Sequence, residues 1–233
     1  MGDIREGIIL KLMHKPRLSF SQLWNKGIDS NKFAYHLKTL EEQGMISKID
    51  NKYELTLKGR QKAGMVDGET GKEKEYPIFC VLIMPMQGDK ILLQERLREP
   101  IYGYWGIVGG RIEAGRNLTE TLEHELEEEA GLKANFEVKG LFVVKTYENH
   151  KLAYTHYHIL VKAFNVNGKL KTKIKEGRNK WFKISDVPKL KIFPDMPKLI
   201  EMAQRKGFSI VEMNRYMEDK QFKSIEIVNE ITI

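Results

Sequence analysis

The sequence predicts two domains: a small N-terminal α+β domain with three helices and a hairpin, and a larger C-terminal α/β domain. Apolar residues follow helical spacing through most of residues 1–66, whereas strand-length apolar runs prevail from residue 76 onward. Between them, residues 67–75 are polar, contain glycine and lack apolar periodicity, which is typical of a linker. The charge divides at the same place, because residues 1–66 hold 12 Lys and Arg against 7 Asp and Glu, and residues 67–233 hold 27 against 25.

The composition is that of a soluble globular protein, since 41% of the residues are hydrophobic and 30% are charged. The single cysteine, Cys80, excludes an internal disulfide and suits a reducing cytoplasm, where we expect the protein to reside. The longest apolar run ends at Met86 and is interrupted by Pro85, so it is too short to span a membrane and no membrane partner is expected. An isoelectric point near 9.2 favours a polyanionic partner.

Three helices and a hairpin are expected in the N-terminal domain. Helices are predicted over residues 4–14, residues 19–26 and residues 30–43, the last of them stopped by Gly44. Two short strands, residues 46–49 and 53–57, flank Asp50-Asn51, a pair typical of hairpin turns. Residues 58–65 are expected to form a closing helix.

Residues 33–46, with the sequence FAYHLKTLEEQGMI, and the hairpin after them resemble a winged helix-turn-helix domain. In that family the third helix enters the DNA major groove and the wing contacts phosphates or the minor groove. The resemblance implies that DNA is a partner, bound through residues 1–66. The implied contact residues are Asn31, Lys32, Tyr35, His36, Lys38, Lys48 and Lys52. A winged helix that binds protein, with its lysines merely solvated, is the alternative.

The C-terminal domain is expected to be rich in strands. Strands are predicted over residues 77–86, 90–95, 136–146, 152–164 and 181–184, and a final helix over residues 196–206. Residues 207–233 form a C-terminal extension in which Ile225, Ile227, Ile231 and Ile233 alternate with other residues, as in a half-buried strand. An added strand or a homodimer contact would bury these isoleucines, and the sequence does not distinguish the two.

A glutamate-rich helix follows the pair Gly109-Gly110. Six glutamates lie within residues 120–129 without a Lys or Arg among them, and like charges one turn apart repel unless a cation relieves them. At about 100° per residue, Glu125, Glu128 and Glu129 lie together along one edge of the apolar stripe. Carboxylates in this arrangement are ligands for a hard cation such as Mg²⁺ or Mn²⁺. The alternative is a solvated acidic face.

Residues 110–132 resemble the box of the Nudix (MutT-like) hydrolase family. The family pattern is Gly, five residues, Glu, seven residues, then Arg-Glu-aliphatic-x-Glu-Glu-x-Gly-aliphatic. Gly110 opens the pattern, and its second half is matched by Glu125, Leu126, Glu128, Glu129, Gly131 and Leu132. The resemblance implies an α/β/α sandwich with a mixed sheet over residues 76–206. It also implies hydrolysis of a nucleoside diphosphate linked to another moiety by a metal-positioned water.

Two positions depart from the box. Arg116 stands where the family has its first glutamate, which contributes to an outer metal site, and His124 stands where the family has an arginine that orients the glutamates. His124 can keep a hydrogen bond to Glu128, one turn further along the helix. These departures bear on rate and metal stoichiometry rather than on fold.

The resemblance also assigns a site. Mg²⁺ or Mn²⁺ would be held by the Gly109 carbonyl, Glu125, Glu128 and Glu129, and the same three glutamates would be catalytic. Glu176, on a later loop, is a further candidate for the catalytic base, against the alternative of a solvated carboxylate. Candidate substrate-binding residues are Gly109, Gly110, Arg111, Arg96 and Trp105, although surface roles for the arginines and core packing for the tryptophan are alternatives.

Three functional hypotheses remain open from the sequence. The first is a metal-dependent Nudix hydrolase of a nucleoside diphosphate derivative, tethered to a DNA-binding winged helix. The second is a non-catalytic transcriptional regulator whose Nudix domain senses ADP-ribose or a related nucleotide, with Arg116 and His124 as marks of lost catalysis. A third is a hydrolase whose winged helix serves only for dimerisation. His156 and His158, two apart on a predicted strand, are a weak further metal candidate.

Overall fold

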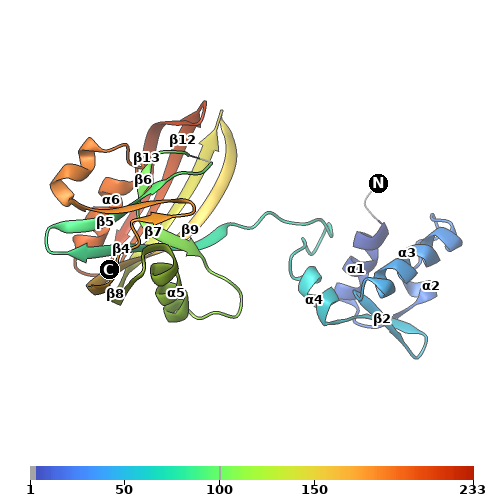
Figure 1. Cartoon of the computed structure of the whole chain (residues 1–233). Helices are drawn as coiled ribbons and strands as arrows, with labels where there is room; N and C mark the ends of the chain where they lie inside the picture. Colours follow the sequence, from blue (N-terminus) through green and yellow to red (C-terminus); the bar gives the residue numbers. More distant parts are fainter. Residues whose placement is uncertain (1–3, 100) are drawn as a thin grey trace. The chain divides into compact units, whose positions relative to one another are not determined.

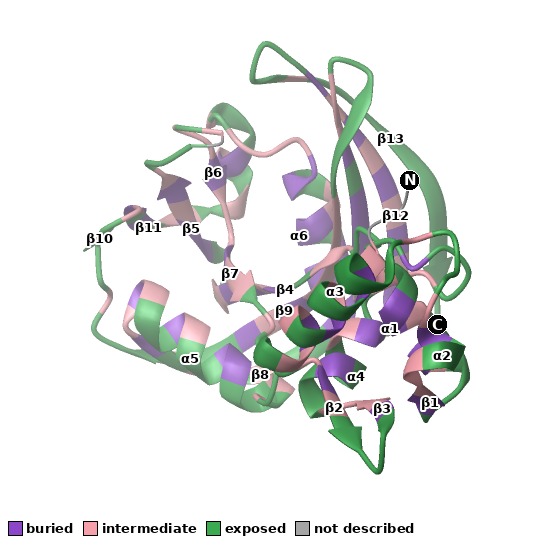
Figure 2. Cartoon of the chain, turned by 90° about the vertical axis from the view of Figure 1, so that its right-hand side faces the viewer, coloured by how far each residue is buried: buried purple, intermediate pink, exposed green. Residues whose placement is uncertain are grey.

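The helical and strand-rich parts of the chain fold as separate units, and the boundary along the chain lies between Glu75 and Tyr76. The structure is a computed structural model and describes residues 4–99 and 101–233 (Figure 1). Each unit has a hydrophobic core of its own, which Figure 2 shows as buried segments within each set of elements. No helix in the described ranges is both long and apolar enough to cross a membrane.

The N-terminal unit combines helices with a small antiparallel sheet of order β1-β3-β2. Its elements are α1 (Ile4–His14), β1 (Leu18–Ser19), α2 (Phe20–Leu23), α3 (Ser30–Glu42), β2 (Ile46–Ile49), β3 (Lys52–Leu55) and α4 (Leu57–Ala63). The apolar residues of α1 and α3 that follow helical spacing meet in its core, among them Ile8, Phe33 and Leu37. The helix and hairpin arrangement predicted from the sequence is therefore present.

Local signals set the ends of α3 and the turn of the hairpin. The Asp29 side chain accepts a hydrogen bond of 2.9 Å from the Lys32 backbone and caps the helix. Gly44 follows the helix in the left-handed region (φ +68°), which glycine adopts without strain. Asp50 and Asn51 also have positive φ, and this conformation closes a two-residue hairpin between β2 and β3.

The predicted second helix over residues 19–26 is too long. Helix α2 ends at Leu23, and Trp24 has extended backbone angles (φ −62°, ψ 129°). The Trp24 indole donates to the Ile28 carbonyl at 2.9 Å, and the Asn25 side chain accepts from the Gly27 backbone at 3.1 Å. These side-chain bonds replace further helical turns, because they offer the backbone a competing set of partners.

Residues 67–75, predicted to be a linker, have local order. The Asp67 carboxylate accepts hydrogen bonds from the backbones of Glu69 and Thr70 at 3.0 and 2.8 Å. It also forms an ion pair of 2.7 Å with Lys74. His14 of α1 contacts the Gly68 carbonyl at 2.8 Å. Polar side chains thus fold most of this segment into a turn of the N-terminal unit instead of leaving it extended.

The C-terminal unit is built on one mixed sheet of order β10-β11-β5-β4-β9-β8-β12-β13, to which β6 and β7 add at β5 and β4. The strands are β4 (Ile78–Gln87), β5 (Lys90–Arg96), β6 (Trp105–Gly106), β7 (Val108–Arg111), β8 (Leu132–Glu148), β9 (Lys151–Gly168), β10 (Lys173–Ile174), β11 (Gly177–Lys183), β12 (Ser209–Glu218) and β13 (Gln221–Thr232). The pairs β4–β9 and β8–β12 are parallel, and the remaining pairs are antiparallel.

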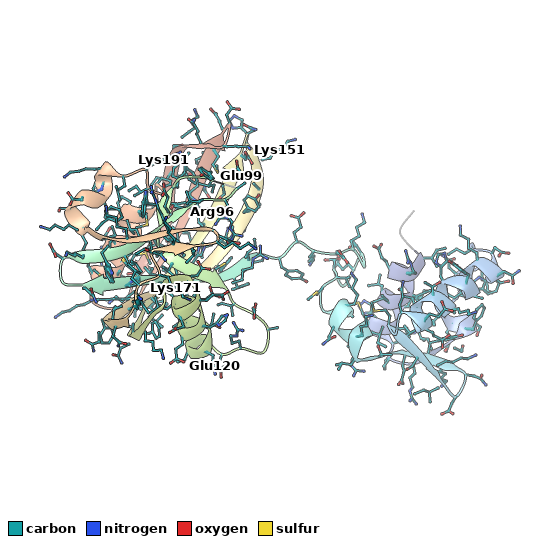
Figure 3. The ribbon with its side chains drawn as sticks, in the orientation of Figure 1. Arg96, Glu99, Glu120, Lys151, Lys171 and Lys191 are labelled. Atoms are coloured by element: carbon teal, nitrogen blue, oxygen red, sulfur yellow. The ribbon has the colours of Figure 1, made fainter. Side chains whose placement is uncertain are left out.

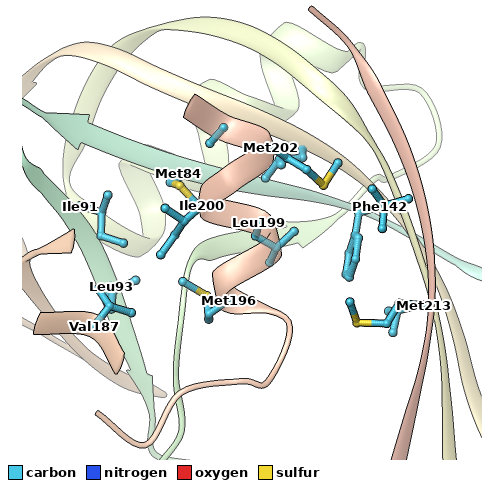
Figure 4. Packing of buried hydrophobic residues seen from close by; sticks show 14 of the residues in the cluster. Met84, Ile91, Leu93, Phe142, Val187, Met196, Leu199, Ile200, Met202 and Met213 are labelled. Atoms are coloured by element: carbon cyan, nitrogen blue, oxygen red, sulfur yellow. The ribbon is translucent and has the colours of Figure 1, made fainter. Parts of the chain in front are cut away.

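Helices cover both faces of this sheet, which gives the α/β/α sandwich predicted from the box. Helix α5 (Leu118–Ala130) packs on one face through Leu122 and Leu126, against Val81 and Ile83 of β4. Helix α6 (Met196–Gln204), preceded by the 3₁₀ helix η1 (Ile184–Lys189), packs on the other face. Figure 4 shows this second core, where Phe142 lies close to Met202 and Met213.

The C-terminal extension is part of the sheet. Strand β12 pairs in parallel with β8, and β13 returns antiparallel to β12 as the edge strand. Glu230 of β13 is held by Lys198 and Arg205 of the α6 region at 2.7 and 3.0 Å. An added strand is therefore the outcome, but it leaves the isoleucines substantially exposed, with Ile227 at 48% and Ile231 at 45%. The predicted homodimer stays a prediction.

Candidate functional site

The glutamate-rich helix α5 has strong signals at both ends. Asn117 accepts from the Glu120 backbone at 2.9 Å, and the Glu120 carboxylate accepts from the Asn117 backbone at 3.1 Å, so the two residues form a capping box at the start of the helix. Gly131 ends the helix with φ +68°. Lys171 donates to the Glu127 and Glu128 carbonyls at 2.8 and 3.1 Å, which places a cation at the negative end of the helix dipole (Figure 3).

The glycine pair lies directly against this helix and its neighbouring strand. In β7, Gly109 and Gly110 pair with Leu82 and Val81 of β4. A Cβ atom at Gly110 would lie 2.0 Å from a carboxylate oxygen of Glu125, and one at Gly109 would lie 2.2 Å from the Val81 carbonyl. Only glycine allows the Glu125 carboxylate to approach the β7 backbone this closely.

Each box glutamate has a different neighbour. Glu129 accepts a hydrogen bond of 2.9 Å from Gln94 of β5, and Glu128 lies 3.0 Å from the His124 ring. The contact of His124 with Glu128 one turn later agrees with the prediction for that substituted position. Glu125 is half-buried against Gly110, whereas Glu123 and Glu127 are exposed on the solvated side.

Burial raises the pKa of Glu125 above its usual range, and the negative charge of Glu129 raises it further. His124 and Arg116 act in the opposite direction, and Glu128 adds to the increase. The fold therefore destabilises the ionised form of the Glu125 carboxylate relative to its protonated form. A divalent cation beside the three carboxylates would remove that destabilisation.

The donor set fits Mg²⁺ or Mn²⁺, because three carboxylates and the Gly109 carbonyl are all hard oxygen ligands. The space that a Cβ atom would fill at Gly110 keeps the Glu125 oxygens next to that backbone. Across residues 4–99 and 101–233, no three His, Cys, Asp or Glu side chains converge closely enough to hold a metal ion. Glu128 instead contacts His124, and Glu129 accepts a hydrogen bond from Gln94. Rotation of these two side chains would be needed for the predicted ligand set to form.

Arg116, at the position of the family's first glutamate, forms an ion pair of 3.3 Å with Glu113. Its guanidinium is near enough to lower the pKa of Glu125 slightly. This position therefore carries a cation and supplies no outer metal ligand.

Glu176 lies in the turn before β11 and is paired with Arg98 at 2.7 Å, with both side chains partly exposed. Its backbone carbonyl accepts from Leu97, which ties the turn to the end of β5. Arg96 is half-buried at the same place, and burial lowers its pKa; Figure 3 shows it beside Glu99. Because Arg98 already occupies the Glu176 carboxylate, this geometry favours a structural role for Glu176.

Trp105 was predicted to bind substrate, and the structure places it in the core. It is 9% exposed and packs edge-on against Phe182 at 4.9 Å. The Arg178 guanidinium lies over its ring at 5.6 Å. Its position on β6, opposite β5, turns the indole into the apolar interior. Arg111, by contrast, is exposed at the end of β7, next to the glycine pair.

The predicted DNA-contacting residues lie at the surface of the N-terminal unit. Asn31, Lys32, Tyr35, Lys38, Lys48 and Lys52 are exposed, and His36 is partly so. Tyr35 is 66% exposed on α3. Lys38 is 3.8 Å from Glu42, and Lys48 lies over the Tyr53 ring. A solvent-exposed ion pair such as Lys38–Glu42 contributes little to stability, so Lys38 is available for another partner.

Sequence reasoning missed Gln94, which holds Glu129. The residue follows the alternation of β5 and carries no local signal, because its contact to α5 joins segments that are distant along the chain. The two histidines His156 and His158 stack on each other at 5.3 Å, and in the described part of the chain they do not join a third His, Cys, Asp or Glu in a group that could hold a metal ion.

An α/β/α sandwich with a glycine pair leading to a glutamate-rich helix defines a Nudix-type domain. Residues 75–203 match the Nudix domain, and the chain belongs to the Nudix family. It is 27% identical over 116 residues to the uncharacterized Nudix hydrolase YvcI of Bacillus subtilis (strain 168), covering 49% of this chain and 70% of that protein.

Two solved structures are also similar. The crystal structure of the MutT protein from Bacillus halodurans has a TM-score of 0.54 and 23% identity, covering 65% of this chain and 97% of that one, which shows a shared fold. The Nudix domain of NrtR from Shewanella oneidensis, complexed with ADP ribose, has a TM-score of 0.49 and 19% identity, covering 62% of this chain and 96% of that one.

Glu125→Gln is expected to stabilise the metal-free protein at about pH 8 and not at about pH 4. The pKa of Glu125 is higher in the folded protein than in the unfolded one, so its ionisation destabilises the fold. This destabilisation is absent at pH values below the unfolded-state pKa and is fully present above the folded-state pKa. Melting temperatures of the wild type and the variant, measured in chelator at both pH values, test this. Glu123→Gln on the exposed side is the matched control. Equal gains at both pH values would contradict the raised pKa.

Proposed function

We propose that this protein hydrolyses a nucleoside diphosphate linked to another moiety, in the presence of Mg²⁺ or Mn²⁺. The observation that carries the proposal is the half-buried Glu125 carboxylate against Gly110, with Glu128 and Glu129 beside it on α5. Glu125 and Glu129 are both half-buried, and their like charges, without a Lys or Arg in the helix, repel each other unless a cation binds. Membership of the Nudix family supports the same reaction class.

Glu125, Glu128, Glu129 and the Gly109 carbonyl would hold the metal. Bound there, the ion would neutralise the charge of the pyrophosphate and lower the pKa of a bound water. Gln94 holds Glu129 through its hydrogen bond, and His124 holds Glu128. Both carboxylates would have to rotate away from these partners when the ion binds.

The phosphates would contact Arg111 beside the glycine pair and Arg96 at the end of β5. We assign the base to the box glutamates in preference to Glu176, because Arg98 already pairs with that carboxylate. The deciding experiment incubates full-length protein and Mg²⁺ or Mn²⁺ with ADP-ribose, nucleotide sugars, NADH, dinucleoside polyphosphates and nucleoside triphosphates. Turnover that chelator abolishes supports the hydrolase.

The second candidate is a regulator that binds a nucleotide without consuming it. The observation that favours it is Arg116, which places a cation paired with Glu113 where a catalytic domain has a carboxylate. Under this alternative, no member of the panel is hydrolysed, while ADP-ribose or a related compound raises the melting temperature of the full-length protein.

We further propose that the N-terminal unit is a winged helix that binds DNA. Support comes from α3 with exposed Tyr35 and Lys38, and from the β2–β3 hairpin with exposed Lys48 and Lys52. Its excess of basic residues suits a phosphate backbone. Both the regulator and the tethered hydrolase require the N-terminal unit to bind DNA.

Lys48→Gln and Lys52→Gln are each expected to weaken DNA binding at every sequence tested. Each should lower the slope of log affinity against log salt by about 1, because one phosphate contact is lost. Fluorescence anisotropy of duplex DNA at several salt concentrations measures the slope. Lys90→Gln, an exposed residue of the C-terminal unit, is the control. Salt-independent binding, or no binding, would favour a winged helix that contacts protein.

A further inference from the structure

The C-terminal end of α5 is held by Lys171, a residue outside the helix (Figure 3). The last carbonyls of an α-helix have no donor within it and need one from elsewhere. The Lys171 ammonium donates to the Glu127 and Glu128 carbonyls at 2.8 and 3.1 Å, and its backbone N–H donates to the Ala130 carbonyl at 2.8 Å. One residue therefore supplies donors to most of the carbonyls in the last turn.

Asn179 of β11 supplies the remaining donor. Its Nδ2 atom donates to the Glu129 carbonyl at 2.6 Å and to the Lys171 carbonyl at 2.8 Å. Because both partners are carbonyls, the side-chain amide must present its NH₂ group to them. Asn179 is only 4% exposed, and its backbone N–H donates to the Thr172 carbonyl at 3.0 Å. It therefore connects both the helix and Lys171 to the sheet. We call Lys171 and Asn179 the α5 clamp.

Two neighbouring strands hold Glu129 at its side chain and at its backbone. Gln94 of β5 is the register partner of Asn179 of β11. Gln94 donates to the Glu129 carboxylate, whereas Asn179 donates to the Glu129 carbonyl. The carboxylate would have to leave Gln94 to reach a metal ion, but the bond between Asn179 and the carbonyl does not have to break. Asn179 thus fixes the backbone from which the side chain rotates.

The last turn of α5 needs support from outside because its own sequence weakens it. Glu127, Glu128 and Glu129 lie at the end where the helix dipole is negative, and the turn contains no basic residue. Repulsion among these carboxylates and with the dipole favours fraying of the turn. Lys171, in the connection between β9 and β10, supplies the missing cation. The order of the turn that carries Glu128 and Glu129 therefore depends on residues outside the box.

We propose that Lys171 and Asn179 are positioning residues for the carboxylates that bind the metal ion. They hold the backbone of the last turn, so that rotation of the Glu128 and Glu129 side chains alone brings these groups to the ion. Both act through the α5 backbone and not as ligands. The inference rests on the proposed function in taking α5 as the metal-binding element.

The direction of the effect separates positioning from simple charge. Lys171 is a cation close to an expected cation site. If it acted only through its charge, its removal would tighten metal binding, because like charges repel. If it positions the last turn, its removal weakens metal binding although that repulsion is relieved. A purely stabilising role would lower the melting temperature and leave the metal affinity of the folded protein unchanged.

The test is titration of metal-free, full-length protein with Mn²⁺ alone, with the free ion measured by electron paramagnetic resonance. Asn179→Leu and Lys171→Met are each expected to weaken Mn²⁺ binding about tenfold. Lys171→Arg keeps a cationic donor and should largely restore the affinity. Lys58→Met is the matched control and should bind Mn²⁺ as the wild type does. Lys58 makes the same kind of bond at the end of another helix, since it donates to the Gln43 carbonyl after α3 at 2.9 Å.

Hydrogen exchange of the metal-free proteins provides a second readout. Amides in the last turn of α5 are expected to exchange faster in Asn179→Leu and Lys171→Met than in Lys58→Met, because the turn opens more often. Melting curves establish that each variant is folded at the temperature of the titration. If buried Asn179→Leu does not fold, exposed Lys171→Met decides the question.

Three results would overturn the inference, and they differ in what they leave standing. Wild-type Mn²⁺ affinity in both clamp variants would reduce Lys171 and Asn179 to a stabilising role. Tighter binding in Lys171→Met would mean that this lysine acts through its charge alone. Both of these results leave the proposed metal site intact. Absence of Mn²⁺ binding to the wild type would instead remove the proposed metal site, and the inference with it.

Discussion

Glu129→Gln is expected to lower the metal-dependent hydrolysis rate by roughly 100- to 1000-fold. The substitution removes one negative charge from the set that would hold the cation, while the amide still reaches Gln94, whose side chain is 2.9 Å from the Glu129 carboxylate. The fold should survive, because Glu129 is only half-buried and the apolar stripe of α5 is untouched. Steady-state rates with the best compound of the panel, at saturating Mg²⁺, measure the effect.

The matched control is Glu127→Gln, which removes the same charge from the exposed side of the same helix. Its rate should stay within about threefold of the wild type, because an exposed charge contributes little through water. If both variants lose activity equally, the effect comes from the total charge of the helix. That result would refute a specific ligand role for Glu129.

Phe142→Ala is expected to destabilise the C-terminal unit by about 3–5 kcal/mol. The ring is fully buried on β8, within the cluster that includes Met202 of α6 and Met213 of β12 (Figure 4). Removing it leaves a cavity between the sheet and the helix and also removes the ring stacked on His158. Urea unfolding combined with hydrogen exchange and mass spectrometry, read from peptides of residues 76–233, measures the loss.

Phe79→Ala is the control for this prediction. Phe79 is 52% exposed and loses mainly its stack on Tyr157, so a cost of about 1 kcal/mol is expected. Equal losses for the two variants would show that the α6 face of the sheet is not the main core of the unit.

The helix of the box was predictable because its signals are local. Asn117, Glu120 and Gly131 are caps that act within one or two turns, and the structure has them in those roles. The hairpin turn at Asp50 and Asn51 is local in the same sense. Likewise, the predicted segments at β4, β5 and α6 match the observed elements to within a few residues.

Elsewhere side-chain bonds and long-range contacts decided the outcome. The second helix was predicted too long because Trp24 and Asn25 bond to nearby backbone instead of continuing it. The role of Trp105 depends on which side of β6 faces the core, which sequence alternation over two residues does not define. The pairing of Thr146 with Arg215 arises only when β12 docks on β8, so no local pattern in the sequence predicted it.

The most direct test of the proposed hydrolysis is turnover in ¹⁸O-labelled water, followed by mass spectrometry of the products. If a water positioned at Glu125, Glu128 and Glu129 attacks phosphorus, each turnover places one ¹⁸O atom in a single phosphorylated product, and Glu129→Gln gives the same label at a much lower rate. Label outside a phosphate group, which would mean attack at carbon, or no turnover of any compound with either metal, would contradict the account.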